Sequence, residues 1–173
     1  MTSKSTPRPG DPGWMKYLAE GNAKQARKRV CADALIRDPE GRLLLVDPNY
    51  KEGWDLPGGM AEANEPPLDA LRRELREELG LDLLVQRLLC VDWVAPKEPW
   101  DDLVGFVFDA GILTADEAAA VRPRDDELTS CAFFTPAEAL RRLPQPQRRR
   151  TQQALTSLNT GQPVYLHNGT PAW

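Results

Sequence analysis

The chain has 173 residues and a formal net charge of −4 at pH 7, with a pI near 5.1. This length suits one domain with a proper core and predicts no second enzyme domain and no separate DNA-reading domain. The acidic balance argues against broad nucleic-acid binding, which relies on clustered basic charge, so no stable nucleic-acid partner is expected.

The amino-terminal and cysteine patterns predict a soluble, cytoplasmic protein. The start, MTSKSTPRPGDPG, has no apolar core of signal-peptide length, and no stretch approaches about 18 continuous apolar residues. Cys31, Cys90 and Cys131 are odd in number and lie in apolar runs. This is typical of reduced, buried thiols rather than of a disulfide framework. No membrane association is expected.

The first predicted elements precede the main domain. Residues 1–13 are rich in Ser, Thr, Pro and Gly and are expected to form a flexible tail. In residues 14–27, Trp14, Tyr17 and Leu18 fall at helical spacing. This segment is predicted to be a short amphipathic helix that lies on the domain, or a linker.

Strands and helices then alternate. Arg29–Asp38 and Arg42–Val46 are predicted to be strands joined by a turn. The later elements are a helix over about Pro67–Leu79, strands over Leu81–Val94, Leu103–Asp109 and Leu128–Phe134, a helix from a Thr135 capping box to about Leu143, and a helix over about Gln147–Leu158. This order predicts an α/β sandwich with helices on two sides of a mixed sheet.

The helix over Pro67–Leu79 carries the most informative pattern. Its apolar stripe consists of Leu68, Leu71, Leu75 and Leu79, spaced three or four residues apart. Pro67 suits a first helical turn, and Gly80 suits the left-handed residue just past a helix end. The stripe is therefore expected to pack on a sheet.

Three acids share the face beside this stripe. Glu74, Glu77 and Glu78 are three and four residues apart, so on a helix they project from one face. Crowded carboxylates invite either full solvation or a cation. All-oxygen ligands favour Mg²⁺ or Mn²⁺, and one histidine with three scattered cysteines makes a zinc site hard to assemble. Arg73 is four residues before Glu77, where its guanidinium could orient a carboxylate.

The spacing around these acids resembles the signature box of the Nudix hydrolases at every defining position. The order is Gly59, five residues, Glu65, seven residues, Arg73-Glu74-Leu75, one residue, Glu77-Glu78, one residue, Gly80-Leu81. Many members carry glycine where this chain has Asn64, but asparagine tolerates a left-handed backbone better than most residues, so the turn is expected to survive. A merely solvated Glu/Arg face would explain none of these distances.

This resemblance covers roughly residues 28–143 and implies the Nudix α/β/α sandwich with a mixed sheet. Residues 144–173 are expected to form a C-terminal helix and tail packed on the domain. The resemblance also implies a hydrolase that cleaves a diphosphate bond in a nucleoside diphosphate linked to another moiety, by in-line attack of a metal-activated water.

The resemblance implies a role for each acid. Glu74, Glu77 and Glu78 would bind one or more Mg²⁺ or Mn²⁺ ions, with the main-chain carbonyl of Gly58 as a further ligand. Glu74 is the first candidate for deprotonating the attacking water. Glu127, in an acidic loop before the last predicted strand, is the later candidate and is also expected near the substrate, with a solvated turn as the open alternative for this loop. Glu65 is interpreted as an anchor of the loop, and Arg73 as an orienting residue.

Substrate choice depends on residues outside the box. The candidates lie in loops or at strand ends: Lys51, Trp54, Trp93, Lys97 and Trp100. A base could stack on an indole while a lysine meets phosphate, although packing is at least as common for tryptophan. The Arg148-Arg149-Arg150 run is expected to be a solvated helix face, although it could still touch a phosphate. The expected partner is a small-molecule nucleotide diphosphate, and a homodimer is left open.

Three other classes remain as alternatives. A nucleotide-binding module of Nudix descent would not cleave its ligand, but such modules commonly lose box acids that this chain retains. An isoprenyl-diphosphate isomerase shares the fold but needs a catalytic cysteine in a local setting that Cys31, Cys90 and Cys131 do not show. A transcription regulator would need an additional DNA-reading domain.

Overall fold

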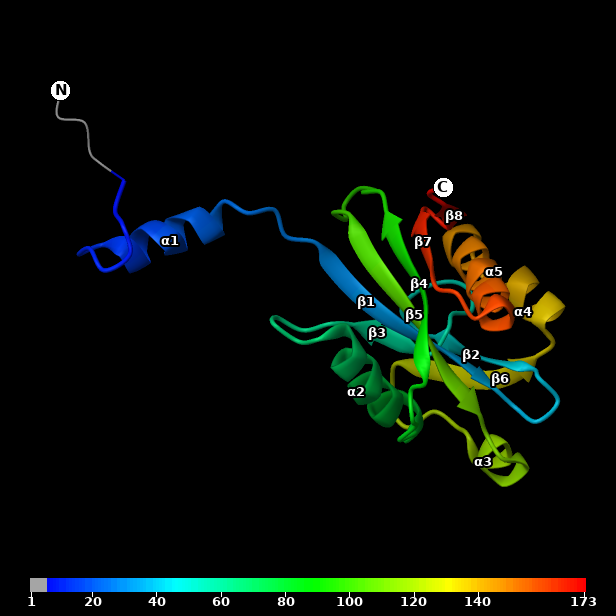
Figure 1. Ribbon diagram of the computed structural model, residues 1–173. Coiled ribbons are helices and arrows are strands. Elements are labelled where there is room, and N and C mark those ends of the chain that lie inside the picture. Colours follow the sequence, from blue (N-terminus) through cyan, green and yellow to red (C-terminus); the bar gives the residue numbers. More distant parts are fainter. Residues whose placement is uncertain (1–5) are drawn as a thin grey trace.

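The computed structural model describes residues 6–173 and is built around one mixed eight-stranded sheet (Figure 1). The strands are β1 (Arg29–Arg37), β2 (Leu43–Pro48), β3 (Gly58–Met60), β4 (Arg87–Val94), β5 (Leu103–Ile112), β6 (Leu128–Phe134), β7 (Val164–His167) and β8 (Thr170–Pro171). Their order is β6-β2-β1-β5-β4-β7-β8, and β3 pairs with β1. The first five residues of the expected tail lie outside the described residues.

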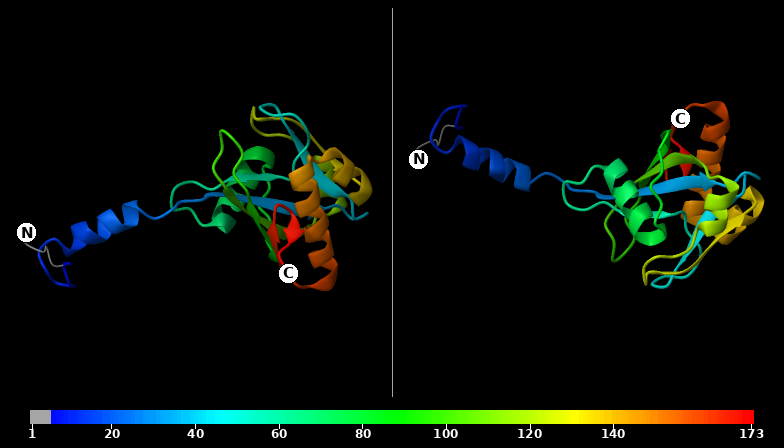
Figure 2. Two further views of the ribbon diagram at one scale, coloured as in Figure 1. Left: turned by 90° about the horizontal axis from the view of Figure 1, so that it is seen from above. Right: turned by 90° about the horizontal axis from the view of Figure 1, so that it is seen from below.

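Helices cover both faces of this sheet (Figures 1 and 2). The helices of residues 6–173 are α1 (Trp14–Ala23), which lies apart from the sheet, and α2 (Pro67–Leu79), α3 (Ala115–Ala120), α4 (Pro136–Arg142) and α5 (Gln145–Thr160). Helix α2 packs on one face, and α4 and α5 pack on the other. The predicted α/β sandwich with a mixed sheet is confirmed.

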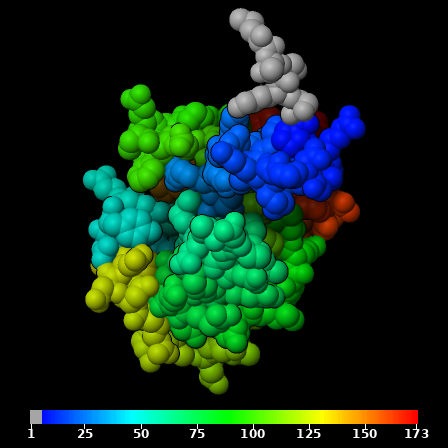
Figure 3. Space-filling view, turned by 90° about the vertical axis from the view of Figure 1, so that its left-hand side faces the viewer, coloured from blue at the N-terminus to red at the C-terminus, as the bar shows by residue number. Residues whose placement is uncertain are grey.

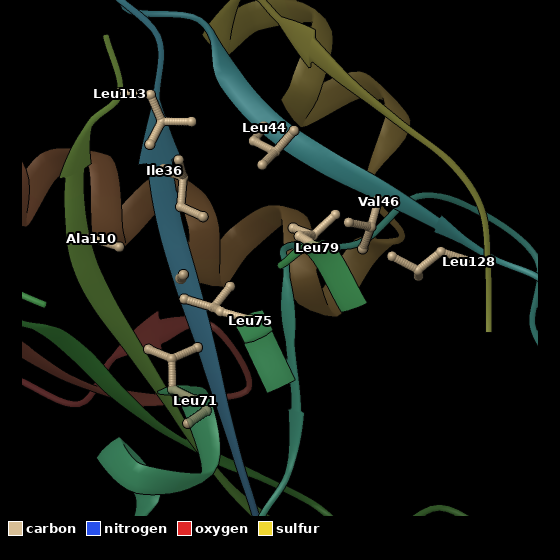
Figure 4. Packing of buried hydrophobic residues seen from close by; sticks show 11 residues of the cluster. Ile36, Leu44, Val46, Leu71, Leu75, Leu79, Ala110, Leu113 and Leu128 are labelled. Atoms are coloured by element: carbon tan, nitrogen blue, oxygen red, sulfur yellow. The ribbon is translucent and has the colours of Figure 1, made fainter. Parts of the chain in front are cut away.

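The core is split into two layers because successive residues of a strand point to opposite faces. On β1, Ala34 and Ile36 belong to the cluster under α2, whereas Leu35 belongs to the cluster under α4 and α5. Figure 4 shows Leu71 and Leu75 of α2 lying along β1. Three of the four stripe leucines are therefore in the core, and Leu68 is partly buried.

Leu75 is expected to be a main contributor to this packing, because it is 1% exposed. Leu75→Ala should lower the free energy of unfolding by about 2–5 kcal/mol, from lost burial and the cavity left behind. Urea unfolding followed by circular dichroism measures this change. Leu84 is 81% exposed, so Leu84→Ala should change stability by less than about 0.5 kcal/mol. Equal losses in the two variants would contradict the predicted packing.

Most predicted boundaries agree with the structure, but the strand expected over Leu81–Val94 begins only at Arg87. Leu83 and Val85 are partly buried against the α2 cluster, whereas Leu84 between them is exposed. Burial of alternate residues in this irregular segment therefore produces the same apolar pattern as a strand. Pairing between β4 and β5 starts at Arg87 and Asp109; the Gln86 N–H still donates to the Asp109 carbonyl at 2.8 Å, but residues 81–86 form no registered pair with β5.

Helix α3 was not predicted, although its signal was present. Thr114 and Glu117 form a reciprocal capping box like that of Thr135 and Glu138 at α4. Strands β7 and β8 also follow the last predicted helix, and β7 extends the sheet by pairing in parallel with β4.

Helix α1 differs from the expectation that it lies on the domain. It extends away from the sheet in Figures 1 and 2, and in Figure 3 its blue segment lies at the front of the molecule; none of its residues is buried. Trp14 stacks on Tyr17 at 5.8 Å between ring centroids. The helical spacing of these aromatic residues thus brings them onto each other rather than onto the core. Among residues 6–173, no helix has both the length and the apolar character to cross a bilayer.

Candidate active site

Two glycines of β3 allow its backbone to lie very close to strand β1 and to a side chain of helix α2. Gly58 pairs with Asp33 of β1 and has φ +136°, and a Cβ there would lie 2.2 Å from the carbonyl oxygen of Ala32. A Cβ on Gly59 would lie 2.5 Å from the carboxyl carbon of Glu74. Gly58 therefore allows β3 to meet β1, and Gly59 allows the α2 carboxylate to approach the loop.

Glu78 is the most buried acid of the predicted cluster, with 4% exposure. Its Oε2 accepts a hydrogen bond of 3.3 Å from the Gly58 N–H. Burial, together with the negative charges of Glu74, Asp125 and Glu127, raises the pKa of the Glu78 carboxyl to about 8, against the opposing effect of the Gly58 bond. This position therefore favours a positive charge.

Glu74 is held by Arg73 beside the glycine loop. The Nη1 of Arg73 donates to Glu74 at 2.9 Å and to Glu77 at 3.1 Å. Burial raises the pKa of Glu74 even though Arg73 opposes the shift. These contacts fix the direction of the Glu74 carboxylate, and the orienting role of Arg73 in the reaction stays a prediction.

Glu65 anchors the loop through the same guanidinium. The Nε and Nη2 of Arg73 each donate to Glu65 at 3.0 Å, and Glu65 also accepts from the Glu62 N–H at 2.8 Å. Hydrogen bonds to Glu65, with the other carboxylates, raise the pKa of Arg73 well above its usual range. Asn64 adopts a left-handed backbone with φ 65°, as its sequence position predicted.

The three box acids do not point the same way. Glu74 and Glu78 line a pocket that also includes Gly58, whereas the side chain of Glu77 is 57% exposed and lies outside the pocket lining. In residues 6–173, no group of three or more His, Cys, Asp or Glu side chains is gathered closely enough to hold a metal ion. Glu74 and Glu78 nevertheless supply oxygen donors in a region of negative charge, which fits a hard divalent cation.

This pocket has a volume of about 650 Å³, within the range of about 300–1,000 Å³ typical of ligand sites. Lys51 and Glu127, both predicted near the substrate, also line it. The Nζ of Lys51 forms an ion pair with Asp55, which raises the pKa of Lys51 despite partial burial. In Figure 3 the cyan segment near residue 50 and the yellow segment near residue 125 lie beside the segment that begins α2.

Comparison with known proteins gives the family. A family model described as the NUDIX domain matches residues 27–155. The chain belongs to the Nudix family. This agrees with the enzyme class expected from the box, a hydrolase of phosphorus-containing anhydrides.

Individual relatives match this chain over only part of its length. Over 111 residues the chain is 30% identical to the phosphatase NudJ of Escherichia coli K12, covering 62% of this chain and 69% of that protein. It is 47% identical over 47 residues to an RNA pyrophosphohydrolase of Halorhodospira halophila, but that match spans only 26% of the relative.

Solved structures support the same fold. A MutT NUDIX hydrolase from Burkholderia pseudomallei is 32% identical, with a TM-score of 0.55 over 76% of this chain and 98% of that one. The NUDIX domain of Shewanella oneidensis NrtR, solved with ADP ribose, has a TM-score of 0.66 at 19% identity over 83% of this chain and 97% of that one. At that identity the second likeness shows the fold alone.

Two tryptophans expected near the substrate of this Nudix domain lie elsewhere. Trp54 packs edge-on against Phe134, with centroids 4.9 Å apart, in the core layer under α4. The Nε1–H of Trp93 donates to Asp102 at 2.8 Å. Neither indole lines the pocket: the Trp54 ring packs in the core, and the Trp93 ring is held by its hydrogen bond to Asp102. Trp100 does line it, with the Arg29 guanidinium 4.8 Å from its ring centroid.

The pocket also contains residues that the sequence did not indicate, chiefly Arg150 of α5 and Asp33 of β1. Arg150 is 5% exposed, so the expected solvated face for the three-arginine run is wrong for this residue. Successive helical residues are rotated by about 100°, so three in a row cannot share one face. The buried residues Arg150, Ala154 and Ser157 recur at helical spacing, and that periodicity was the available signal.

Proposed function

We propose that the protein hydrolyses the diphosphate bond of a nucleoside diphosphate linked to another moiety, with Mg²⁺ or Mn²⁺ as its cofactor. The observation that carries this proposal is the buried carboxyl of Glu78 at the pocket. In residues 6–173 it forms no ion pair, and its one hydrogen bond comes from the Gly58 N–H. A buried carboxylate without a cationic partner is costly, and a divalent ion would remove that cost.

The proposed ligands are the carboxylates of Glu74, Glu77 and Glu78 with the main-chain carbonyl of Gly58. A bound divalent ion would neutralise phosphate charge and lower the pKa of a bound water. Arg73 holds Glu74 in place, and its Nη1 also forms an ion pair with Glu77. The exposed position of Glu77 makes it the ligand that requires the largest side-chain rotation.

The remaining pocket residues would handle the substrate. Lys51 carries a positive charge at the pocket wall, where its ammonium can meet a phosphate oxygen. Glu127 faces the same space and is, after Glu74, the second carboxylate available to accept a proton from water. The name of one relative, an RNA pyrophosphohydrolase, supports the diphosphate class.

A hydrolysis screen tests this function. The purified protein is incubated with nucleoside triphosphates, sugar nucleotides, ADP-ribose and capped RNA, each with Mg²⁺, with Mn²⁺ or with a chelator, and products are read by mass spectrometry in ¹⁸O-labelled water. Cleavage at a phosphoanhydride with one ¹⁸O in a phosphate product, lost with the chelator, is expected. Binding without any cleavage would instead identify a non-hydrolytic module, and isomerised isoprenyl diphosphate would identify an isomerase.

A further inference from the structure

A buried arginine lies between two aspartates at the edge of the pocket. Arg150 donates from Nε to Asp92 at 3.0 Å and from Nη1 to Asp33 at 3.2 Å. Asp92 is fully buried, and its second oxygen accepts the Gly169 N–H at 2.9 Å. Asp92 therefore holds Arg150 from within the fold, while Arg150 and Asp33 both line the pocket.

One donor and one acceptor of this cluster remain open to the pocket. Within residues 6–173, neither Nη2 of Arg150 nor Oδ1 of Asp33 makes a hydrogen bond. The buried side-chain polar atoms that lack any partner in this range are Arg37 Nε and Thr151 Oγ1, so the two open atoms are not sealed inside the protein. They are free to meet a ligand.

The guanidinium is also held in one place. A Cβ on Gly105 of β5 would lie 2.9 Å from Cζ of Arg150 and 3.2 Å from its Nη2. Any other residue at position 105 would push against the guanidinium. A donor fixed in this way loses little conformational entropy when it binds, which favours specific recognition.

The charge of the cluster selects the kind of ligand. Two carboxylates surround one guanidinium, and the Glu74 and Glu78 carboxyls line the same pocket. A phosphate gains little here, because no positive charge is left uncompensated. A neutral group that offers an acceptor beside a donor matches the open pair, and a nucleobase edge has this pattern, as in N7 and the N6 amino group of adenine.

We propose that Arg150 and Asp33 form the subsite that binds the nucleobase of the substrate. Arg150 Nη2–H donates to a base acceptor, and Asp33 Oδ1 accepts from the adjacent base N–H. The inference rests on the proposed function, because the base belongs to the nucleotide that is cleaved, and it assigns the specificity for a nucleoside to these two side chains.

Calorimetric titration tests the subsite without requiring hydrolysis. AMP, GMP, CMP and UMP are compared with ribose 5-phosphate, which lacks the base, in the presence of Mg²⁺. The wild-type protein should bind at least one nucleotide about 10-fold or more tightly than ribose 5-phosphate, and Arg150→Lys should reduce that advantage by about 10- to 100-fold. Lysine keeps the charge for Asp92 but has no planar fork to serve Asp33 and a base together.

A second variant and a matched control separate recognition from folding. In Asp33→Asn, the amide oxygen must face Arg150 Nη1, so its NH₂ replaces the acceptor at the pocket, and the same selective loss is expected. Arg37 forms a comparable part-buried pair with Asp109 at 2.7 Å and does not line the pocket. Arg37→Lys should therefore leave the nucleotide advantage unchanged, and thermal unfolding reports the fold of all three variants.

Two results would overturn the subsite. One is wild-type protein that binds ribose 5-phosphate as tightly as every nucleotide, and the other is a variant loss that is equal for nucleotides and ribose 5-phosphate. If Arg150→Lys does not fold, the nucleotide selectivity of Asp33→Asn tests the subsite in its place. Base-selective binding without hydrolysis would refute the proposed function alone, whereas hydrolysis without base selectivity would refute the subsite alone.

Discussion

Glu78→Gln is expected to lower turnover of the diphosphate substrate by at least about 10²-fold at saturating Mg²⁺. Glutamine keeps the shape of the side chain and can still accept the Gly58 N–H, but it removes the negative charge that faces the pocket. Loss of one anionic ligand weakens metal-assisted charge stabilisation by several kcal/mol, and each 1.36 kcal/mol is about tenfold in rate. Initial rates over a Mg²⁺ titration measure the change.

The fold of this variant should survive. Glu78 is buried with its pKa raised to about 8, so the metal-free protein gains nothing from the charge. The melting temperature of Glu78→Gln without metal should therefore not fall below that of the wild-type protein. Asp69→Asn is the matched control, because Asp69 is an exposed carboxylate of the same helix paired with Arg72. Normal turnover in Glu78→Gln would remove this residue from the mechanism.

The sequence predicts α2 to the residue because its boundaries depend on local chemistry. Pro67 begins the helix, and Gly80 follows it in the left-handed conformation with φ 66°. The start of β4 depends instead on a partner strand. Its pairing with β5 begins at Asp109, just before Gly111 leaves the extended conformation with φ 85°. No pattern within residues 81–94 contains that information.

In the candidate site too, some features follow from local sequence and others depend on distant parts of the chain. Spacing places Glu74, Glu77 and Glu78 on one helical face, yet adjacent residues differ by about 100° around the axis. That rotation turns Glu78 toward β3 and leaves Glu77 in solvent. Sequence spacing alone cannot say which side of the face meets the sheet. The place of Arg150 in the pocket is harder still to predict from the sequence, because it depends on α5 packing against β4 and β5, which are far away in the chain.

The neighbouring glycines of β3 are expected to fail in different ways when each is replaced by alanine. In Gly58→Ala the new Cβ would meet backbone atoms, at 2.2 Å from Ala32 O and 2.8 Å from Asp33 Cα, at φ +136°. Backbone cannot rotate away, so the free energy of unfolding should fall by about 3 kcal/mol or more. Gly41→Ala also has a positive φ, but nothing lies within 4 Å, and it should cost only about 1 kcal/mol.

In Gly59→Ala the new Cβ would instead meet the flexible end of a side chain, the Glu74 carboxylate, at 2.5 to 2.9 Å. Glu74 can rotate aside, so denaturant unfolding should show a loss of less than about 1 kcal/mol. Its displaced carboxylate would no longer face the pocket beside Glu78. Turnover should therefore fall by about 10-fold or more, because substitutions that disturb the orientation of a metal ligand commonly lower metal affinity or activity by about 10- to 100-fold. Unfolding curves and Mg²⁺-dependent rates on both variants provide the comparison. A Gly59→Ala enzyme with unchanged turnover would mean that the position of Glu74 in the structure is not the one used in catalysis.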